Sequence, residues 1–521
     1  MQDRGRTQEE SSFFPSVSVS SAAFLIVVTL AAALLRGLDL AAKSYWIDEL
    51  ISLNHAKDIT GWSSFFAPSS GDWNPPLYFL LLKGWLVFGE GESHARMLSA
   101  VLGTAVVPAT FALARQFFSR QVSLLASLLV AASPLLLLYD RELRSYPLFT
   151  LVSVISLYFF VRALREGKMR DWAGYTLFTI AGIYSHYHAF LVILGEILFV
   201  CLRYNAYKGR SRLLVVSLAI GAFSYLPMLP TFFIHLHSAN ELHSAGGKFP
   251  VVFGYPAKLL YNGFAFALGQ TLLPWKPVAI VGGLAALTFF ASGLRELRRR
   301  WETAAFFLSC LGVPVVVGSL VSEPTPRHFV FVTPLFCALL ALGIMAVSSK
   351  ALRHFLCVVL GVAWSFGIAN YFANRQFHIL AQVTPWREAG QFLRAHVTRD
   401  DLIIHIALKP KINTEPLSYY AQMHIPVYEQ DVIGSLPALT KQGSVPRVWL
   451  IVSEASLQET GRVAASWLAG HYAECKVWRY FYDPDFRLKK RLFRKDFSEY
   501  RIQIYEFTNP QAVRERAAVS R

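Results

Sequence analysis

Stretches of mostly apolar residues, eleven in all, dominate the chain as far as residue 373. A helix needs roughly 20 apolar residues to cross the hydrocarbon core of a bilayer, so each stretch predicts one spanning helix. Hydrophobic residues make up 54% of the 521 residues and charged residues only 16%, which excludes an ordinary soluble protein of this size. The predicted spans are 17–37, 95–115, 121–139, 146–163, 171–184, 186–203, 211–236, 272–293, 302–322, 327–347 and 352–373.

The first stretch follows a short head that contains Arg4 and Arg6. A basic head before an apolar run resembles a secretory signal. A clear cleavage site of small residues is lacking and further spans follow, so we expect an uncleaved signal anchor.

Basic residues lie in short clusters between the apolar stretches and predict the sidedness of the chain. No single basic stripe accompanies the net charge of +16, so we expect no nucleic-acid partner. If residues 75–89 do not cross, every basic connection lies on one side, which the positive-inside rule makes cytoplasmic. That segment is short for a span and carries Lys83, so we predict a juxtamembrane helix in the first outer loop. The basic connections contain Arg115 and Arg120, Arg162 to Arg170, Arg203 to Arg212, Arg295 to Arg300, and Lys350 and Arg353.

The composition changes near residue 376 to that of a soluble domain. We therefore predict a transmembrane domain over 1–375 and an extracytoplasmic α/β domain over 376–521. The basic run 487–495 does not contradict this side, because long domains translocate largely regardless of charge. The expected helices are 386–396, 416–422 and 456–470, and the expected strands are 401–407, 425–429, 447–453, 476–482 and 500–508.

Two adjacent carboxylates, Asp48 and Glu49, stand just beyond the first span in the sequence YWIDEL. An acidic pair at this place can simply be solvated. Aromatic and apolar neighbours favour instead a partly desolvated site at the membrane interface, where a carboxylate can act as a base.

A very short outer connection, residues 139–147, crowds charged and aromatic side chains between two spans, among them Arg141, Arg144 and Tyr146. One reading is a local ion-pair network that caps two helix ends. The other is an anion site, because guanidinium groups bind phosphate through paired donors.

Further polar residues fall on the same predicted side. His186 and His188 lie two apart between apolar runs, and without a nearby third ligand this spacing favours hydrogen bonding to a substrate over zinc. Arg327 begins a span at the outer face, where an arginine is either an interfacial anchor or a ligand group. The remaining candidates for substrate binding are Asn74, Lys83, Arg96 and His328.

The order of these motifs resembles that of the bacterial members of glycosyltransferase family 39. This family has the GT-C membrane fold and includes protein O-mannosyltransferases and lipid A aminoarabinose transferases. The resemblance covers most of residues 20–375. Its motifs are YWIDEL (45–50), WNPPLYFLLLKGW (73–85), HARMLSAVLGTAVVPATFALARQFFSR (94–120), SPLLLLYDRELRSYPLF (133–149), YSHYHAFLV (184–192) and TPRHFVFVTPLF (325–336).

The resemblance implies transfer of a monosaccharide from a polyprenyl-phosphate-linked donor, on the extracytoplasmic side of the plasma (inner) membrane. Asp48 then matches the family's essential first-loop aspartate, with Glu49 beside it. Arg144 and Tyr146 match the family's Arg-x-Tyr, and Arg327 matches the arginine that faces the donor phosphate.

Two positions depart from the family pattern. Asn74 stands where many members have His before Pro-Pro, and His328 stands where a Tyr usually follows the arginine. Both departures bear on which donor or acceptor the protein prefers, and they leave the reaction class unchanged. The expected acceptor is a glycan, a lipid or a protein.

The residue types fit inverting transfer with one base. The acceptor hydroxyl must lose a proton to a carboxylate, whereas the leaving phosphate needs its charge neutralised by arginine. A divalent cation held by Asp48 and Glu49 is an alternative. With one donor phosphate and several arginines at hand, we expect no catalytic metal and no other cofactor.

A transporter or flippase of a lipid-linked sugar is the competing interpretation. It predicts inverted repeats and ionisable residues near the middle of the membrane. Glu196, within the stretch 186–203, is the main residue that fits it, whereas the other polar groups gather at one face. A sensor with a ligand-binding tail finds no support in the spans.

Overall fold

The chain is described by a computed structural model over residues 21–67, 74–245, 254–321, 326–375, 380–406, 415–428, 432–441, 445–453, 458–482, 487, 491 and 500–509. The basic head, the first four residues of the predicted span 17–37 and most of the basic run 487–495 lie outside the described residues.

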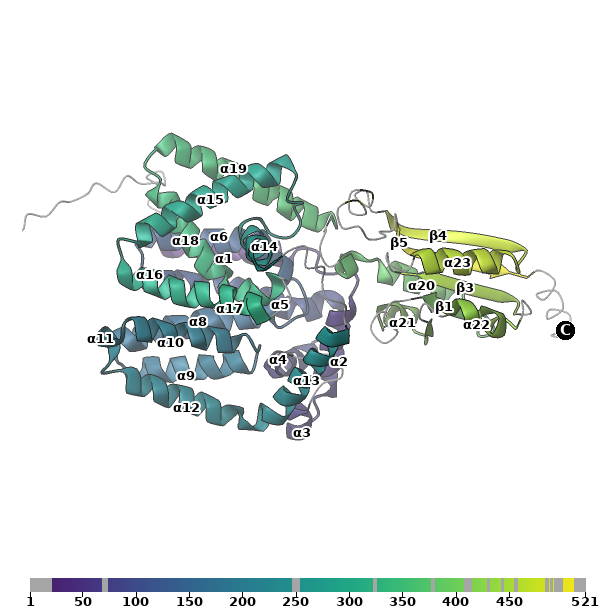
Figure 1. Cartoon of the computed structure of the whole chain (residues 1–521), viewed down its shortest axis with the longest axis horizontal. Helices are drawn as coiled ribbons and strands as arrows, with labels where there is room; N and C mark the ends of the chain where they lie inside the picture. Colours follow the sequence, from purple (N-terminus) through teal and green to yellow (C-terminus); the bar gives the residue numbers. More distant parts are fainter. Residues whose placement is uncertain are drawn as a thin grey trace, which may run out of the picture.

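A body of helices is joined to a small five-stranded sheet that lies beyond one end of the body (Figure 1). The helices of the body are α1 (Ser21–Gly37), α2 (Ile47–Asp58), α3 (Trp62–Phe66), α4 (Leu77–Leu86), α5 (Glu92–Ala114), α6 (Arg120–Ala132), α7 (Pro134–Asp140), α8 (Tyr146–Glu166), α9 (Met169–Ile183), α10 (Ala189–Leu202), α11 (Tyr204–Tyr207), α12 (Ser211–Tyr225), η1 (Leu226–Met228), α13 (Leu229–Ala245), α14 (Tyr255–Leu268), α15 (Pro277–Leu297), α16 (Trp301–Phe307), η2 (Leu308–Gly312), α17 (Val313–Val321), η3 (Pro326–Val332), α18 (Thr333–Ala346) and α19 (Lys350–Phe372).

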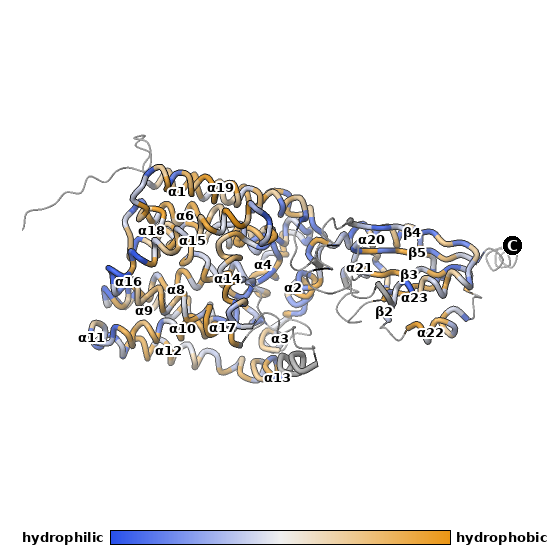
Figure 2. Tube along the Cα trace, turned by 45° about the horizontal axis from the view of Figure 1, so that its top comes forward, coloured by the Kyte–Doolittle hydropathy of each residue, from blue (hydrophilic) through white to orange (hydrophobic). Residues whose placement is uncertain are grey.

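Every predicted span corresponds to helical structure. Seven helices in the described part of the chain are long and apolar enough to cross a membrane, or up to eight if α6 and α7 form one bent span. The other predicted spans form the shorter helices α1, α9 and α10. The helices are apolar along much of their length, with hydrophilic residues gathered at their ends (Figure 2). The chain is a multi-pass membrane protein, and the count of eleven spans stays a prediction.

One predicted span is broken near its end. Residues 121–139 form α6 and α7, whose axes differ by 54°. Pro134 causes the break, because its ring nitrogen cannot donate the hydrogen bond that would continue the helix. Oγ of Ser133 restarts the helix by accepting a hydrogen bond from the backbone N–H of Leu136 at 3.4 Å. The short helix α7 ends at Asp140, and the 139–147 connection therefore lies at the end of the body near the sheet.

At the opposite end of the body, where Figure 1 places α11 and α16, side chains link three of the basic connections. Nη2 of Arg165, in the last turn of α8, donates to Oε1 of Glu302 at 2.7 Å, and Tyr207 donates to the same oxygen at 3.0 Å. Arg210 donates to the carbonyl oxygen of Leu164. The clustering of basic connections at one end agrees with the prediction from charge, and the assignment of this end to the cytoplasm stays a prediction.

The end of the body next to the sheet, here called the sheet-side end, carries the connection between the first two predicted spans, which contains the helices α2, α3 and α4. The segment 75–89 forms α4, as predicted, and its ten residues extend only about 15 Å along the helix axis. This length is about half of the hydrocarbon thickness that a span must cross. The sequence did not predict α14, which lies between the predicted spans 211–236 and 272–293.

The C-terminal residues form a sheet of order β2-β1-β3-β5-β4, in which β2, β1 and β3 are parallel and β5 runs antiparallel to both of its neighbours. All predicted strands and helices of this part are present, and α22 was missed. The elements are α20 (Trp386–His396), β1 (Leu402–Ile406), α21 (Glu415–Ala421), β2 (Val427–Tyr428), α22 (Val432–Leu439), β3 (Arg447–Val452), α23 (Gln458–Ala469), β4 (Glu474–Tyr482) and β5 (Tyr500–Thr508), with the short turn η4 (Leu380–Val383) leading in.

Alternating side chains of the central strand β3 define the two faces of the sheet. Trp449 and Ile451 pack with α20 and α21, whereas Val448, Leu450 and Val452 pack with α22 and α23. Both faces are covered, which explains why β1 and β3 are apolar apart from His405 and Arg447. The layer of α20 and α21 also makes the contacts to the body that are described below.

Candidate active site

Asp48 lies in the first turn of α2, where the positive end of the helix dipole stabilises an acidic side chain. Its Oδ2 accepts a hydrogen bond from Nη1 of Arg327 at 3.1 Å, and each of the two side chains is 24% exposed. Arg327 belongs to η3 and comes 279 residues later in the chain. The residue predicted as base and the arginine predicted to bind phosphate are therefore direct partners in a partly open site.

Arg144 holds the start of α2 from the short turn between α7 and α8. Its Nη1 donates to the carbonyl oxygen of Asp48 and to Oγ of Ser52, both at 2.9 Å. Its guanidinium carbon lies 5.9 Å from the ring centre of Tyr146, within the range of a cation–π contact. Arg144 thus orients the helical turn that carries Asp48, and Tyr146 lines the same site.

Glu49 points away from this site into the interior. Its Oε1 accepts from Nε of Arg96 at 2.7 Å, and its Oε2 accepts from Nη2 of the same residue at 2.6 Å. The backbone N–H of Leu143 donates to Oε1 at 2.9 Å. Arg96 also donates to three carbonyl oxygens of the loop that leads into α2. These are the surroundings of a buried structural ion pair, and they differ from those expected of a second catalytic acid beside Asp48.

Arg141 and Asp140 likewise bind distant elements instead of one another. Arg141 donates to the carbonyl oxygen of Arg36 at the end of α1, at 2.8 Å, and to the hydroxyl of Tyr371 at 3.1 Å. Asp140 pairs with Nε of the fully buried Arg36 at 2.7 Å. Arg141 therefore caps α1, which is a structural role. Sequence reasoning overlooked Arg36, although a charge near the end of an apolar run was a signal.

Three imidazoles converge beside Arg327. The ring centre of His188 lies 4.8 Å from that of His186 and 5.6 Å from that of His328, and the latter two are 6.3 Å apart. Burial lowers the pKa of His186 well below its ordinary value and that of His188 to about 4, so both rings are neutral. Within the described ranges, no group of three or more His, Cys, Asp or Glu side chains is arranged to hold a metal ion.

The helix α4 begins next to the histidine loop, because the backbone N–H of Leu77 donates to the carbonyl oxygen of Tyr184 at 2.9 Å. Asn74 comes three residues before Leu77 and is therefore near that loop. Lys83 is placed elsewhere. Its ammonium group donates to the carbonyl oxygen of Ile59, about 16 Å along α2 from Asp48. The structure does not bring Lys83 to Asp48.

Comparison with known proteins gives a family match over part of the chain. Residues 73–230 match the sequence model of the family described as dolichyl-phosphate-mannose-protein mannosyltransferase. No curated protein matches the chain.

Three solved structures share the fold over most of the chain. ArnT from Cupriavidus metallidurans in the apo state has a TM-score of 0.54 at 13% identity, over 94% of this chain and 98% of that chain. The oligosaccharyltransferase of Archaeoglobus fulgidus tethered to an acceptor peptide gives 0.55 at 13% identity, over 92% and 74%. The same organism's AglB in complex with an inhibitory peptide and a dolichol-phosphate gives 0.52 at 13% identity, over 86% and 71%. This chain has the GT-C fold. Together with the family match, the fold supports a GT-C glycosyltransferase.

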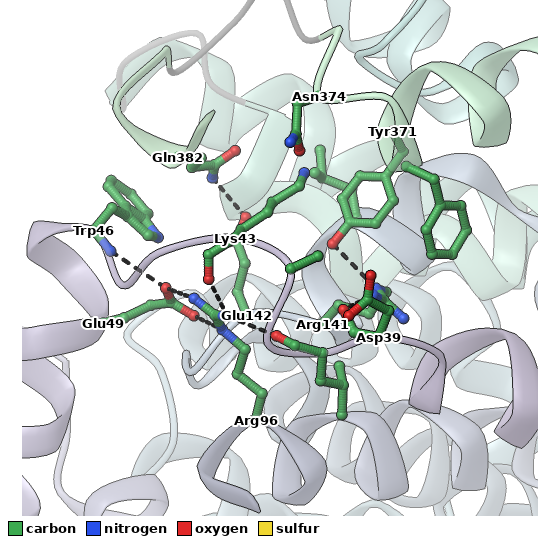
Figure 3. Close-up of a pocket in the computed structure, with 14 residues that line it drawn as sticks. Asp39, Lys43, Trp46, Glu49, Arg96, Arg141, Glu142, Tyr371, Asn374 and Gln382 are labelled. Atoms are coloured by element: carbon green, nitrogen blue, oxygen red, sulfur yellow. Dashed lines mark hydrogen bonds and ion pairs between the residues drawn. The ribbon is translucent and has the colours of Figure 1, made fainter. Parts of the chain in front are cut away.

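A small pocket of the GT-C body is lined in part by Glu49, Arg96 and Glu142 (Figure 3). Its volume of about 30 Å³ is enough for about two water molecules and not for a sugar. Nε2 of Gln382 donates to Oε1 of Glu142 at 2.5 Å across it. Burial raises the pKa of Glu142 well above its ordinary value and lowers that of Lys43 to about 7. The pocket shares Glu49 and Arg96 with the buried ion pair described above.

A buried polar chain extends the site on the side of Tyr146 and was also missed from the sequence. The ring of Tyr139 lies 5.5 Å from that of Tyr146, and its hydroxyl donates to Oε1 of Gln270. Nε2 of Gln270 donates in turn to the hydroxyl of Tyr261 on α14 at 2.9 Å. Isolated tyrosines and a glutamine in apolar sequence carry no spacing signal, so only the fold reveals this chain of hydrogen bonds.

Proposed function

We propose that the protein is a membrane glycosyltransferase that moves a monosaccharide from a polyprenyl-phosphate-linked donor to an acceptor hydroxyl, with Asp48 as the base. The single observation that carries this proposal is the ion pair between Asp48 and Arg327 at 3.1 Å. It joins a proton acceptor to a phosphate-binding group in one partly exposed site. The GT-C fold and the dolichol-phosphate bound by the archaeal neighbour support a lipid-phosphate ligand.

The chemistry follows from these two groups. The acceptor oxygen attacks the anomeric carbon while the bond from that carbon to the phosphate oxygen breaks, and the configuration inverts. The acceptor proton passes to Asp48, and the electron pair of the broken bond stays on the phosphate. Arg327 stabilises that developing negative charge.

Arg327 and Asp48 cannot keep all of their present contact during the reaction. A donor phosphate offers Arg327 two or more oxygens and competes with the single carboxylate oxygen that it now meets. Transfer of Arg327 to the phosphate would free Asp48 for the acceptor proton. Donor binding would in this way leave the Asp48 carboxylate free to accept a proton. The ion pair of Glu49 and Arg96 would hold α2, the helix that carries Asp48, in place.

The sheet-side end would face the extracytoplasmic side of the plasma membrane. The basic connections at the other end of the body support this orientation through the positive-inside rule. The soluble domain proposed for residues 376–521 would lie on the same side as Asp48. A lipid donor then keeps its tail in the bilayer while its sugar reaches the site.

Asp48→Asn tests the proposal. Cells that carry the wild type, Asp48→Asn or the control Asp58→Asn are compared by mass spectrometry of envelope glycans and polyprenyl-phospho-sugars. Asp58 is an exposed acid at the other end of α2. We expect the first variant alone to accumulate a donor and to leave an acceptor short of one sugar. Normal glycans with Asp48→Asn would remove Asp48 from the mechanism.

A further inference from the structure

The imidazoles of His186, His188 and His328 form a compact cluster with an apolar wall. The ring of His186 stacks on Phe149, with centres 5.1 Å apart and planes at 19°. The ring of His188 meets Phe329 edge to face at 5.5 Å. The backbone N–H of His188 donates to Nδ1 of His186 at 3.1 Å, which fixes the orientation of the His186 ring.

Nε2 of His188 is buried and has no hydrogen-bond partner within the part of the chain that the structure describes. A buried polar nitrogen without a partner costs free energy, and a ligand oxygen placed between the rings would remove that cost. We therefore expect an oxygen atom of a ligand to accept a hydrogen bond from His188 in the cluster.

The cluster borders directly on the cationic part of the site. His328 follows Arg327 in the chain, and the ring of His186 lies 6.1 Å from that of Tyr146. The charged and titratable groups that face the imidazoles from the packed elements are Arg144 from the turn before α8, Tyr146 from α8 and Arg327 from η3. A phosphate bound by the two arginines would thus be next to the imidazoles.

The proposed reaction changes the charge of that phosphate. The donor is a phosphodiester with one negative charge, whereas the product is a phosphate monoester that carries about 1.5 to 2 negative charges at pH 7. Guanidinium groups keep one fixed charge through the whole reaction and respond to this change only through distance. Neutral imidazoles can donate an N–H or take up a proton when the second charge appears.

We propose that His186, His188 and His328 form a subsite that distinguishes the product phosphate monoester from the donor phosphodiester. This inference rests on the proposed function and adds to it a selective recognition of the second phosphate charge. The two arginines bind either ester, and the imidazoles bind the additional charged oxygen of the monoester. Proton uptake by the cluster makes this preference grow as the pH falls.

The test uses the full chain in detergent micelles and two short probes, citronellyl phosphate and its methyl phosphodiester. Dissociation constants are measured for both at pH 6 and pH 8. We expect the wild type to bind the monoester about tenfold more tightly than the diester, with the larger ratio at pH 6. In His188→Gln/His328→Gln, the ratio falls to about one because the affinity for the monoester falls more than the affinity for the diester.

A matched control is His405→Gln. His405 is also fully buried, but it lies in β1 and hydrogen-bonds to Oγ of Ser453 at 2.7 Å. This variant should leave both dissociation constants unchanged. If the double variant does not fold, His328→Gln alone is measured at both pH values and should reduce the ratio part of the way.

The outcomes separate this proposal from the one on which it rests. Equal affinity of the wild type for both esters, or an unchanged ratio in the histidine variants, would overturn the subsite and leave the glycosyltransferase proposal in place. If the wild type bound both probes no better than Arg327→Gln does, this result would overturn the phosphate site itself and the subsite with it.

Discussion

Asp48 and Glu49 are neighbours in the chain, but their carboxylates have different partners. Asp48 meets Arg327 at 3.1 Å in a partly open site, whereas Glu49 meets Arg96 at 2.6 Å in the interior. Consecutive side chains of a helix point about 100° apart, so the first turn of α2 directs one acid to η3 and the other to α5. The acidic pair that the sequence presents as one feature is therefore two features with separate tasks.

Glu49→Gln should affect stability more than chemistry. Loss of the carboxylate leaves Arg96 buried without its countercharge, which costs about 3–5 kcal/mol of unfolding free energy. The control is Glu90→Gln, because Glu90 pairs with Lys57 on the surface and such a pair contributes less than about 1 kcal/mol. Chemical unfolding of the detergent-solubilised protein measures both changes. A Glu49→Gln protein of normal stability that has lost sugar transfer would show that Glu49 is itself catalytic.

Contacts from the C-terminal part hold the loop that leads into α2. The hydroxyl of Tyr420 on α21 accepts from the backbone N–H of Tyr45 at 2.7 Å and donates to Glu92. Arg387 on α20 pairs with Glu92 and donates to the carbonyl oxygen of Ala41 at 2.8 Å. These bonds indicate that the α/β part positions Asp48 through the chain that precedes it.

Tyr420→Phe removes that support with little change in shape. We expect faster amide hydrogen exchange over residues 41–46 and a kcat lowered about fivefold, with a smaller change in the KM for the donor, since one hydrogen bond is worth about 1 kcal/mol. Tyr419→Phe is the matched control because the Tyr419 side chain is 46% exposed. Unchanged exchange over 41–46 in Tyr420→Phe would mean that the C-terminal part does not position the loop.

The pH dependence of stability should report on Lys43. Burial lowers its pKa from 10.5 to about 7, so the unfolded chain binds more protons than the native chain between these values. The free energy of unfolding therefore rises with pH through this window, by at most about 1.4 kcal/mol per pH unit for one proton. Glu142, with a raised pKa, contributes with the opposite sign.

Lys43→Met should flatten this rise and stabilise the protein below pH 7, where wild-type Lys43 is charged in its buried place. Thermal unfolding at a series of pH values, with the exposed Lys57→Met as control, isolates the effect of Lys43. Identical slopes for the wild type and Lys43→Met would show that Lys43 titrates normally.

Local patterns predicted the helices and strands well because apolar length and alternation are properties of single segments. The strands 402–406 and 447–452 were found where the sequence placed them, but their pairing in the order β2-β1-β3-β5-β4 is non-local and left no local signal. The helix α14 was missed because its fourteen residues are too few for a span and include Lys258 and Asn262.

The sequence predicted which residues belong to the site better than it predicted which residue each of them contacts. Charge sorting brought Asp48, Arg144 and Arg327 to one end of the body, as the structure has them. The partner of each charge depends on the rotation of each helix about its axis, which apolar runs do not specify. Asp140 therefore pairs with Arg36 on α1 instead of with its neighbours in the 139–147 connection.

Substitution of Glu196 distinguishes a transferase from a carrier of lipid-linked sugar. It is buried between helices and its Oε2 accepts from the hydroxyl of Tyr175 at 2.7 Å, away from Asp48 and Arg327. Because a glutamine oxygen accepts the same hydrogen bond, we expect Glu196→Gln to keep sugar transfer within about twofold of the wild type. A carrier that depends on an ionisable group in the membrane would lose its activity. Transfer assays in proteoliposomes with donor supplied on the side of Asp48 decide between them, since such a supply bypasses any transport step.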